Sequence, residues 1–485
     1  MTHQMVKQRL STGVSGLDEV LYGGLLANRA YLIRGGPGTG KTTLGLHFLA
    51  VGVAQGESCL YITLGESAEQ IRDNAKSLNI DAEPITFLDL SPNTEFFTQV
   101  QTYDIFSPAE VEREPTTKRI VEAVETKKPQ RVFLDAITQF RYLSSDAFLF
   151  RKQVLSFIRF LLSQGATVMF SSEGTERTPD DDLQFISDGV IHLNHSQLDR
   201  SLCVAKFRGS DFQHSFHSMR LTKTGMEVFP RLQPEVYKQE FVAQTISSGI
   251  SELDEMLHGG LERGTVTLIT GATGVGKTTL GLQFMKEAAL RGERAVIYTF
   301  EEAENSLLHR SESVNIPLYD MQQKETLSIV EVQLLRLAPD EFARLVRHEV
   351  EVKQAKIVML DSIAGYRLSL QGENLVRHLH ALCKYLQNMG VTVLLINETE
   401  HITGEFHTSE WGISHLTDNI VFLRYIEVQG QMRKAIGVLK KRLSDFEKTL
   451  REIEITRYGV QVSKPLHSVR RIFSRTPEWI GNDSQ

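Results

Sequence analysis

Short apolar segments recur along the chain, separated by longer segments in which apolar and polar residues alternate with a helical period. Near-continuous apolar runs of six to eight residues are typical of β-strands that are buried on both faces of a sheet. Such runs lie at 30–35, 59–66, 131–136, 167–173 and 189–195 in the first half, and at 265–271, 295–302, 356–362, 392–398 and 419–425 in the second.

Two of the intervening segments, 150–165 and 375–390, have the spacing of amphipathic helices, and each ends in glycine, as helices commonly do. Strands that alternate with helices predict an α/β fold with a mostly parallel central sheet in each half. The last part of each half, at 205–222 and 437–456, is expected to form a terminal hairpin.

The second half of the chain repeats the first. The segment STGVSGLDEVLYGGL at 11–25 returns as SSGISELDEMLHGGL at 247–261, which is 236 positions later. GGPGTGKTTLGL at 35–46 returns as GATGVGKTTLGL at 271–282 with the same offset. Matched landmarks in the same order indicate a tandem duplication of one domain.

The duplication sets the expected domain organisation. A polar stretch with little periodicity lies at 230–245, between the two copies, and contains two prolines. We therefore expect an N-terminal nucleotide-binding domain at 1–236 and a C-terminal one at 237–485.

Both halves contain the phosphate-binding pattern G-x-x-x-x-G-K-[ST], directly after an apolar run and at the start of a helical segment. The glycines allow successive backbone N–H groups to face phosphate oxygens, and the helix N-terminus adds partial positive charge. We expect Lys41 and Lys277 to neutralise the β- and γ-phosphates of ATP, and Thr42 and Thr278 to offer a hydroxyl to Mg²⁺. The expected nucleotide-binding residues are Gly36, Pro37, Gly38, Thr39, Gly40, Lys41, Thr42 and Thr43, and Ala272, Thr273, Gly274, Val275, Gly276, Lys277, Thr278 and Thr279.

Two aspartates end matched apolar runs, Asp135 in RVFLDA and Asp361 in KIVMLDS. A carboxylate at the C-terminal tip of a parallel strand faces the nucleotide crevice. We therefore predict that both lie on the Mg²⁺ side of the nucleotide, as Walker-B aspartates do. The alternative is that each merely caps the following helix.

Glutamates follow the second apolar run of each half, Glu66 in the first and Glu301 and Glu302 in the second. A carboxylate beside the γ-phosphate can accept the proton of an attacking water or hydroxyl, which makes all three candidate catalytic residues. The alternative is that they only begin the next helix. The halves differ here, because Gly65 precedes Glu66 where the second half has a glutamate pair.

Composition narrows the classes of function. The chain has 485 residues, of which 41% are hydrophobic and 23% charged, with a net charge of −7. This is a globular balance without a strongly basic overall surface for nucleic acid. The N-terminus has no signal-peptide core, and no run of about 18 apolar residues occurs, so we expect a cytoplasmic protein. The three cysteines lie in apolar surroundings and are expected to be small buried hydrophobes.

The leading signature, the phosphate-binding loop after it and the duplication of the whole resemble the KaiC family of circadian-clock-type ATPases and autokinases. The segment ISHLTDNIVFLRYIEVQGQMRKAI at 413–436 makes that resemblance specific, and the similarity extends from about 11 to about 480. It implies two RecA-like P-loop domains with ATP and Mg²⁺ as cofactors. It also implies a homohexameric double ring with ATP bound between neighbouring subunits.

The resemblance implies a slow ATPase in the first half and autophosphorylation of a hydroxyl on the adjacent subunit in the second. Glu301 is then the candidate base for the acceptor hydroxyl. Gly65 takes the place of the leading glutamate in the first half, so hydrolysis there is expected to be slower or to rest on Glu66 alone.

The acceptor pair of the family falls on Ser414 and His415 of this chain, where only Ser414 carries a hydroxyl. Ser414 is therefore the expected phosphorylation site, and a two-site cycle at this pair is not supported. Ser409 and Thr417 are nearby alternatives, and Ser414 could instead serve only to stabilise a turn or helix.

A K-x-R pattern recurs near the end of each half, as Lys206 with Arg208 and Lys440 with Arg442. Alternation along a strand puts both cations on one face. The resemblance implies that they reach the γ-phosphate held by the neighbouring subunit and are catalytic. The alternative is a solvated basic edge strand.

The resemblance also bears on partners. After KPLHSVRRIFSRTPEWI at 464–480 five residues remain, whereas clock-type members carry a longer tail that receives an activating partner. We expect no KaiA-type tail interaction. A KaiB-like partner on the first ring, a true oscillation and the output partner are not decided by the sequence.

Two other functions compete with the enzyme. A RecA-like motor on DNA would need basic or aromatic loops, whereas TERTPDDDLQF at 175–185 carries three consecutive aspartates, so a nucleic-acid partner is not expected. A nucleotide-gated scaffold with vestigial hydrolysis is favoured by Gly65 for the first half only.

Overall fold

A computed structural model describes residues 8–91, 108–143, 147–173, 180–196, 199–333, 336–370, 375–399, 415–428, 430–466, 469–470 and 478–479. The chain forms two compact units, Met1–Arg231 and Leu232–Gln485. Leu232 packs into an apolar cluster of the second unit, and the Asn388 side chain donates a hydrogen bond to the Pro234 carbonyl at 2.8 Å. The domain boundary placed after residue 236 from the sequence stays a prediction.

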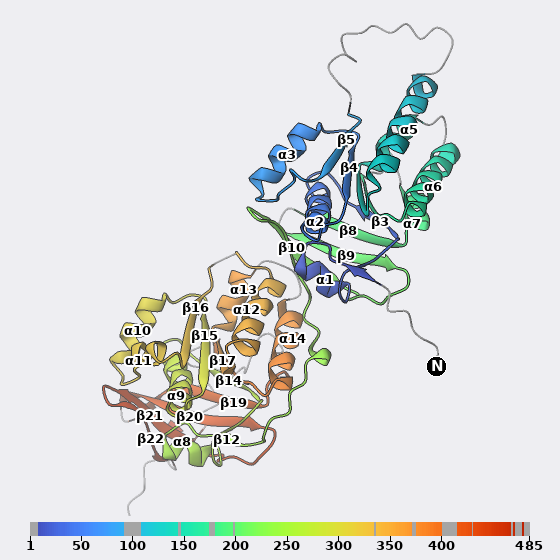
Figure 1. The fold of residues 1–485 in the computed structure, drawn as a ribbon. Helices are drawn as coiled ribbons and strands as arrows, with labels where there is room; N and C mark the ends of the chain where they lie inside the picture. The colour runs from blue at the N-terminus through green and yellow to red at the C-terminus, as the bar shows by residue number, and fades with distance from the viewer. Residues whose placement is uncertain are drawn as a thin grey trace, which may run out of the picture. The chain divides into compact units, whose positions relative to one another are not determined.

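A nine-stranded sheet forms the centre of the first unit (Figure 1). Its order is β5-β4-β6-β7-β3-β8-β9-β10-β11. The strands from β5 to β8 pair in parallel, and the last four in this order pair antiparallel. The strands are β3 (Ala30–Arg34), β4 (Cys59–Thr63), β5 (Thr86–Asp89), β6 (Arg131–Asp135), β7 (Thr167–Ser172), β8 (Gly189–His195), β9 (Arg200–Phe207), β10 (Phe216–Thr222) and β11 (Gly225–Phe229).

The second unit repeats this sheet in the same order, β16-β15-β17-β18-β14-β19-β20-β21-β22. Its strands are β14 (Val266–Gly271), β15 (Arg294–Thr299), β16 (Leu327–Glu331), β17 (Ala355–Asp361), β18 (Thr392–Glu398), β19 (Asn419–Val428), β20 (Gln431–Lys441), β21 (Arg451–Thr456) and β22 (Gly459–Pro465). The predicted fold class, a duplicated α/β domain with a mostly parallel sheet, is confirmed.

Helices cover the sheets. In the first unit they are α1 (Ser15–Val20), α2 (Lys41–Ala54), α3 (Ala68–Ser77), α5 (Pro108–Lys127), η1 (Ile137–Leu143), α6 (Ala147–Ser163) and α7 (Asp181–Ile186). In the second they are η2 (Pro234–Val236), α8 (Ser251–Met256), α9 (Lys277–Leu290), α10 (Glu304–Glu312), α11 (Leu318–Gln323), α12 (Pro339–Glu351), α13 (Ile363–Ser369) and α14 (Leu375–Asn388). Short pairs complete the strands: β1 (Arg9–Leu10) with β2 (Leu25–Leu26), β12 (Thr245–Ile246) with β13 (Leu261–Glu262), and β23 (Val469–Arg470) with β24 (Glu478–Trp479).

The ten strands predicted from apolar runs are present, but the edge strands β5 and β16 were not predicted. An edge strand is buried less completely than a central one, and the residues of β5 are all only half-buried. The predicted terminal hairpins are present as β9–β10 and β20–β21, and each continues into a further antiparallel strand.

The repeated signature at 11–25 and 247–261 is a local hydrogen-bonded turn before a helix. Asp18 accepts from the Thr12 backbone N–H at 2.8 Å, and Asp254 accepts from the Ser248 backbone N–H at the same distance. Each aspartate therefore fixes the entry into its short helix, which explains why serine or threonine and aspartate recur at this spacing.

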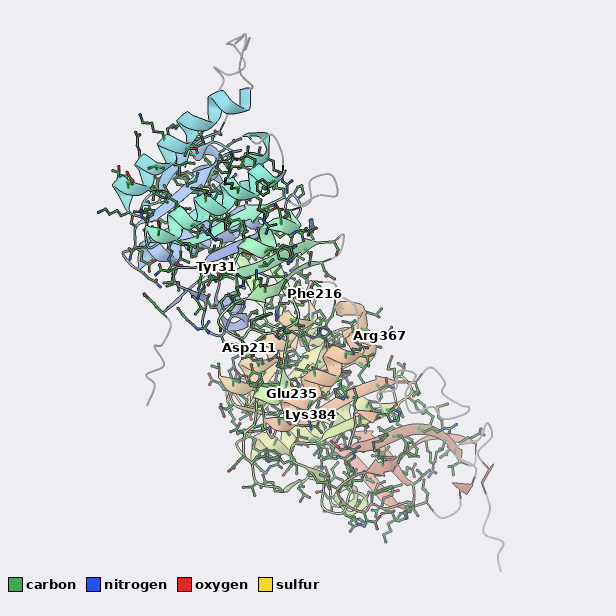
Figure 2. All side chains as sticks on the ribbon, turned by 90° about the vertical axis from the view of Figure 1, so that its right-hand side faces the viewer. Tyr31, Asp211, Phe216, Glu235, Arg367 and Lys384 are labelled. Carbon is green, nitrogen blue, oxygen red and sulfur yellow. The ribbon has the colours of Figure 1, made fainter. Side chains whose placement is uncertain are left out.

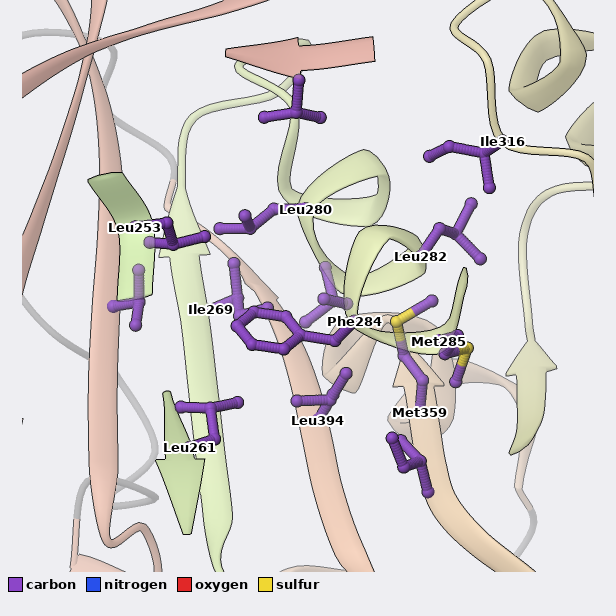
Figure 3. Close-up of a cluster of buried hydrophobic side chains, with 14 of the residues drawn as sticks. Leu253, Leu261, Ile269, Leu280, Leu282, Phe284, Met285, Ile316, Met359 and Leu394 are labelled. Carbon is purple, nitrogen blue, oxygen red and sulfur yellow. The ribbon is translucent and has the colours of Figure 1, made fainter. Parts of the chain in front are cut away.

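The helix after each phosphate-binding loop packs directly onto the sheet. In the second unit, Leu280 and Phe284 of α9 lie against Ile269 and Leu394 of the central strands (Figure 3). Gly281 allows this approach, because an added Cβ would lie 2.4 Å from the sulfur of Met359. Gly45 occupies the same place in the first unit, where an added Cβ would lie 2.1 Å from the ring of Phe133. Close packing thus fixes where each helix begins.

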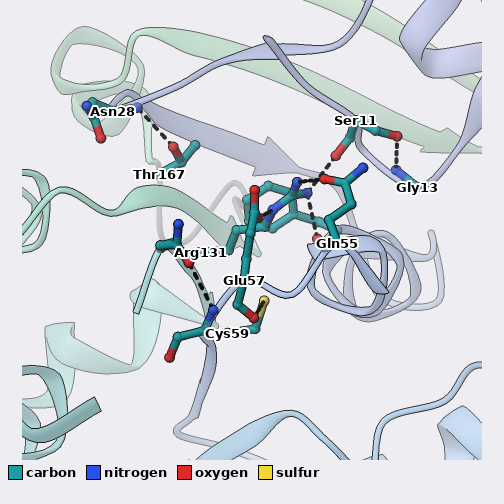
Figure 4. Close-up of polar contacts among 11 residues, drawn as sticks. Ser11, Gly13, Asn28, Gln55, Glu57, Cys59, Arg131 and Thr167 are labelled. Carbon is teal, nitrogen blue, oxygen red and sulfur yellow. Dashed lines mark hydrogen bonds and ion pairs between the residues drawn. The ribbon is translucent and has the colours of Figure 1, made fainter. Parts of the chain in front are cut away.

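Arg131, at the start of β6, is fully buried and joins three parts of the first unit. It donates to the carbonyls of Ser11 at 2.7 Å and Phe48 at 3.0 Å, and it forms an ion pair with Glu57 (Figure 4). Glu235 and Lys384 are exposed on the second unit, whereas Tyr31 is buried in the first (Figure 2).

The three cysteines of the chain are not paired in disulfides. Cys59 and Cys383 are buried, Cys203 is half-buried, and all three are free thiols. None of the helices within the described ranges combines the length and the apolar character needed to cross a bilayer.

Replacement of Arg131 by Met is expected to destabilise the first unit. It would leave the Glu57 carboxylate and two carbonyls without their donor, and breaking a buried ion pair costs about 3–5 kcal/mol. Hydrogen exchange measured by mass spectrometry should increase in peptides from α2 and β6. The control is Arg29→Met, since Arg29 pairs with Asp188 from a side chain that is 40% exposed, and exposed pairs contribute about 0–1 kcal/mol. Equal exchange in both variants would contradict this account.

Candidate nucleotide-binding sites

Each phosphate-binding loop lies between a central strand and the helix that packs on it, β3 and α2 in the first unit and β14 and α9 in the second. The loop turns into the helix through Gly40 with φ +100° and Gly276 with φ +113°. These angles belong to the left-handed region, where glycine has no steric penalty. The last glycine of each pattern is therefore required by the backbone.

Backbone donors gather at the start of both helices. The N–H groups of Gly40, Lys41 and Thr42, and of Gly276, Lys277 and Thr278, donate to no protein acceptor among the described residues. The first N–H groups of a helix have no partner within it and carry partial positive charge. Each loop thus offers a preformed site for an anion such as phosphate.

The loop lysines fold back over their own loops. Lys41 Nζ donates to the Gly35 and Gly36 carbonyls at 2.8 and 2.9 Å, and Lys277 Nζ donates to the Ala272 carbonyl at 3.0 Å. Burial lowers the pKa of both amines, and nearby carboxylates oppose that change in pKa. A bound phosphate would supply the strong acceptor that these amines otherwise find only in carbonyl oxygens.

A hydroxyl and a carboxylate meet in the same way in both units. Thr42 Oγ1 donates to Asp135 Oδ2 at 2.7 Å, and Thr278 Oγ1 donates to Asp361 Oδ2 at 2.6 Å. The second residue of each phosphate-loop helix is thereby joined to the tip of a parallel strand on the other side of the crevice. Oxygen donors of this kind are those that Mg²⁺ prefers.

The surroundings of the two aspartates differ. Asp135 also accepts hydrogen bonds from the hydroxyls of Tyr61, at 2.9 Å, and Ser171. Ile297 and Ile396 stand at the corresponding places in the second unit and offer no donor. Burial raises the pKa of Asp361, while the hydrogen bond from Thr278 acts in the opposite direction. The charges of Arg310 and Lys277 also favour the ionised form of Asp361.

The candidate catalytic glutamates follow β4 and β15. A threonine at the end of each strand, Thr63 or Thr299, donates to the backbone carbonyl of Glu66 at 2.6 Å or of Glu302 at 2.5 Å. This turn places Glu66 and Glu302 equivalently. Glu301, one residue earlier, makes no side-chain hydrogen bond or ion pair within the described ranges. Its charge acts on Lys277, whose pKa it helps to keep from falling further.

Arg310 of α10 distinguishes the second site, and sequence reasoning missed it. Its Nε and Nη2 donate to the two carboxylate oxygens of Glu302 at 3.1 and 2.7 Å. Asn74 stands at the same place in the first unit. Glu302 is therefore neutralised by a bidentate ion pair, whereas the Glu66 carboxylate makes no hydrogen bond within the described residues.

A third carboxylate on each crevice was also missed. Glu398 ends β18 and accepts from Thr273 Oγ1 at 3.0 Å and from Lys277 Nζ at 3.4 Å. Glu173, directly after β7, acts on Lys41 through its charge. The sequence did contain a signal for both residues. The apolar runs at 167–173 and 392–398 each end in this glutamate, and each forms the strand next to the one that ends in the aspartate.

These groups line one pocket per unit, of about 390 Å³ in the first and about 520 Å³ in the second. Such volumes suit a small organic ligand. Of the predicted loop residues, those from Pro37 to Thr43 line the first pocket, and Gly274, Gly276, Lys277, Thr278 and Thr279 line the second. Ala272 and Val275 are buried behind the loop instead. The free N–H donors, the lysine and the hydroxyl–carboxylate pair fit ATP with Mg²⁺ in both units.

The K-x-R cations lie apart from the pocket of their own unit. Lys206 Nζ donates to the carbonyls of Gln184 and Ser187 at 2.6 and 2.7 Å, and Lys440 Nζ donates to the Thr417 carbonyl at 2.6 Å. Arg442 forms an ion pair with Asp418 at 3.3 Å.

Arg208 is exposed at the end of β9. None of these four cations lines either pocket. Ser414, the expected phosphorylation site, lies outside the described residues.

Comparison with known proteins agrees with this geometry. The profile of the KaiC ATPase family matches residues 10–233 and again 246–467, so each unit carries one copy of the domain with its phosphate-binding loop and aspartate. The chain belongs to the KaiC family. The KaiC ATPase domain is present in both halves, which confirms the resemblance drawn from the repeated signature.

Curated KaiC relatives match over nearly their whole length. The circadian clock oscillator protein KaiC of Parasynechococcus marenigrum is 28% identical over 99% of this chain and 95% of its own. The proteins of that name from Synechococcus elongatus and Acaryochloris marina are 27% and 26% identical, over 100% and 98% of this chain and 94% and 92% of their own.

Replacement of Glu398 by Gln is expected to tighten ATP binding at the second site about fivefold, because it removes a negative charge beside Lys277 and keeps an acceptor for Thr273. The factor reflects the modest strength of a partly exposed charge interaction. Calorimetric titration of the Lys41→Ala chain, with the first site disabled, measures it. Glu252→Gln, an exposed change outside both pockets, is the control. Weaker binding in Glu398→Gln would contradict the competition between Glu398 and phosphate.

Proposed function

We propose that this protein binds Mg·ATP in both domains, hydrolyses it in both, and transfers phosphate to its own Ser414 in the second. The observation that carries the proposal is the duplicated set of free N–H donors, loop lysine and threonine–aspartate contact, complete in each unit. Membership of the KaiC family supports the ATPase part, and the names of the relatives support a role as a clock-type switch.

Binding follows from the groups that line each pocket. The N–H groups at the start of α2 and α9 hold the phosphates, and Lys41 and Lys277 exchange their carbonyl partners for phosphate oxygens. The Thr42–Asp135 and Thr278–Asp361 pairs hold the metal. Mg²⁺, when bound there, would neutralise the negative charge that develops on the phosphate during transfer.

Transfer in the second domain needs a base for the acceptor hydroxyl. Glu302 is held by Arg310, which leaves Glu301 as the carboxylate without a partner. Glu301 accepts the proton of the Ser414 hydroxyl, the serine oxygen forms a bond to the γ-phosphorus, and the bond to the β–γ bridging oxygen breaks. ADP leaves with the electron pair of that bond.

Hydrolysis in the first domain proceeds with water as the attacking group. Glu66 has no ion-pair partner comparable to Arg310, since Asn74 stands in its place. We assign Glu66 as the acceptor of the water proton. The absence of a second carboxylate at Gly65 is the reason to expect slow turnover.

We assign the K-x-R cations to the nucleotide that the neighbouring subunit binds. They line neither of the two nucleotide pockets described for their own chain, which supports action across an interface. We accordingly propose a homohexameric double ring with ATP between subunits. A KaiB-like partner on the first ring is a further proposal that rests on the family resemblance alone.

Lys277→Ala is expected to abolish incorporation of phosphate from labelled ATP, because the γ-phosphate loses its main cation, while phosphate release by the first domain continues. Lys41→Ala is the matched variant: release should fall and incorporation should persist. Autoradiography and a phosphate-release assay on the full-length chain measure the two activities.

The same labelled samples locate the acceptor. Ser414→Ala should lose most of the incorporated phosphate by intact mass, without a change in phosphate release from the first domain. If phosphate is still incorporated in Lys277→Ala, kinase activity in the second domain is refuted. If incorporation is lost in Lys277→Ala but persists in Ser414→Ala, the acceptor is another residue.

A further inference from the structure

A reciprocal exchange distinguishes the two nucleotide sites. Where the second domain has Glu301, the first has Gly65, and where the second has Gly365, the first has Gln139. Gln139 and Gly365 are both the fourth residue after the metal-side aspartate, in η1 and α13. Loss of a carboxylate on one side of the crevice thus accompanies gain of an amide on the other.

In the second domain these two positions face each other. A Cβ added to Gly365 would lie 3.2 Å from Glu301 Oε1 and 3.3 Å from Glu301 Cγ. The Glu301 side chain therefore lies along the surface of α13 at this glycine. A side chain at 365 would meet Phe300 first, since its Cβ would lie 2.6 Å from the Phe300 Cβ, and it would also crowd the Glu301 side chain.

In the first domain the space opposite is open. A Cβ added to Gly65 would meet no atom within 4 Å. Gln139 lines the pocket together with Gly65, Glu66 and Asp135. Its side chain is half-buried and makes no hydrogen bond within the part of the chain that the structure describes. Its backbone N–H donates to the Ala136 carbonyl at 3.1 Å, which anchors the residue next to the strand tip.

An unpartnered amide on the wall of a polar pocket is suited to a polar ligand. The amide oxygen accepts one proton of a water molecule and the NH₂ group donates to a phosphate oxygen, so a glutamine can bridge the two. It cannot take up the proton. A glutamine in this place therefore orients water without acting as its base.

We propose that Gln139 is a catalytic residue of the first domain that positions the attacking water in place of the missing carboxylate. This inference rests on the proposed ATPase of that domain. The water oxygen forms a bond to the γ-phosphorus, the bond to the β–γ bridging oxygen breaks, and ADP leaves with its electron pair. The proton of the water that is not held by Gln139 passes to Glu66.

The division of labour has a consequence for what each domain can do. An amide orients the nucleophile but does not remove its proton, as a carboxylate base does. Such orientation suits water, which is a small and mobile nucleophile. The first domain is thereby specialised for slow hydrolysis. The second keeps Glu301 free for a hydroxyl.

The test uses the full-length chain with Lys277→Ala, so that phosphate release reports the first domain alone. Gln139→Met keeps the length of the side chain and removes its hydrogen-bonding groups. We expect kcat to fall about tenfold or more with KM changed less than twofold, because a lost orienting contact affects the reacting water rather than bound nucleotide. Gln70→Met, an exposed change on α3 outside the pocket, is the control and should leave both constants unchanged.

Two further variants recreate the second site. Gly65→Glu together with Gln139→Gly should restore kcat at least to that of the Lys277→Ala parent, whereas Gln139→Gly alone should remain as slow as Gln139→Met. Recovery in the pair is a readout that loss of folding would not give.

The outcomes are distinct. If the parent releases no phosphate, the proposed first-domain ATPase is wrong. If the parent is active and Gln139→Met matches it in kcat, or loses ATP retention instead, the assignment of Gln139 to the water is overturned while the ATPase stands.

Discussion

The contact between a loop threonine and a strand-end aspartate is the constraint on which both sites depend. It joins the start of the phosphate-loop helix to the tip of a strand that lies two places in the sheet from the strand before the loop. The hydrogen bond is 2.7 Å long between Thr42 and Asp135 and 2.6 Å between Thr278 and Asp361. A contact this short needs a helix fixed against the sheet, and the glycines at 45 and 281 permit that packing. The free N–H groups, the lysine and the glutamates take their positions from this frame.

The frame is shared, but the chemistry around it has diverged. Asp135 accepts hydrogen bonds from three hydroxyls, whereas isoleucines replace two of these donors around Asp361, whose pKa is raised by burial. A bidentate arginine holds Glu302 and none holds Glu66. Glu301 and Gly365 of the second unit are matched by Gly65 and Gln139 in the first. Duplication thus preserved the phosphate-binding loop and the threonine–aspartate contact, and the residues around them diverged.

Local sequence was sufficient for much of this. Apolar runs predicted the central strands because these are buried on both faces, and the phosphate-binding loops were found because only glycine permits their backbone angles. The aspartates were found because a strand end is a defined place in a parallel sheet. The edge strand β5 was missed, since its half-buried residues lack a continuous apolar pattern.

The remaining site residues depend on side-chain contacts that the sequence pattern does not specify. Tyr61 and Ser171 reach Asp135 from neighbouring strands, and Arg310 reaches Glu302 from the next helix. No spacing rule links such partners, because the sheet order brings them together. Gln139 belongs to no sequence motif. It became a candidate only when the equivalent positions of the two domains were compared in the structure.

The number of nucleotides held by one chain tests the central claim most directly. Equilibrium dialysis or native mass spectrometry with Mg²⁺ and a non-hydrolysable ATP analogue counts them without reference to turnover. Two complete sites predict two bound nucleotides per chain at saturation. One nucleotide, or none, would contradict the account, because the threonine–aspartate frame would then not be sufficient to make a site.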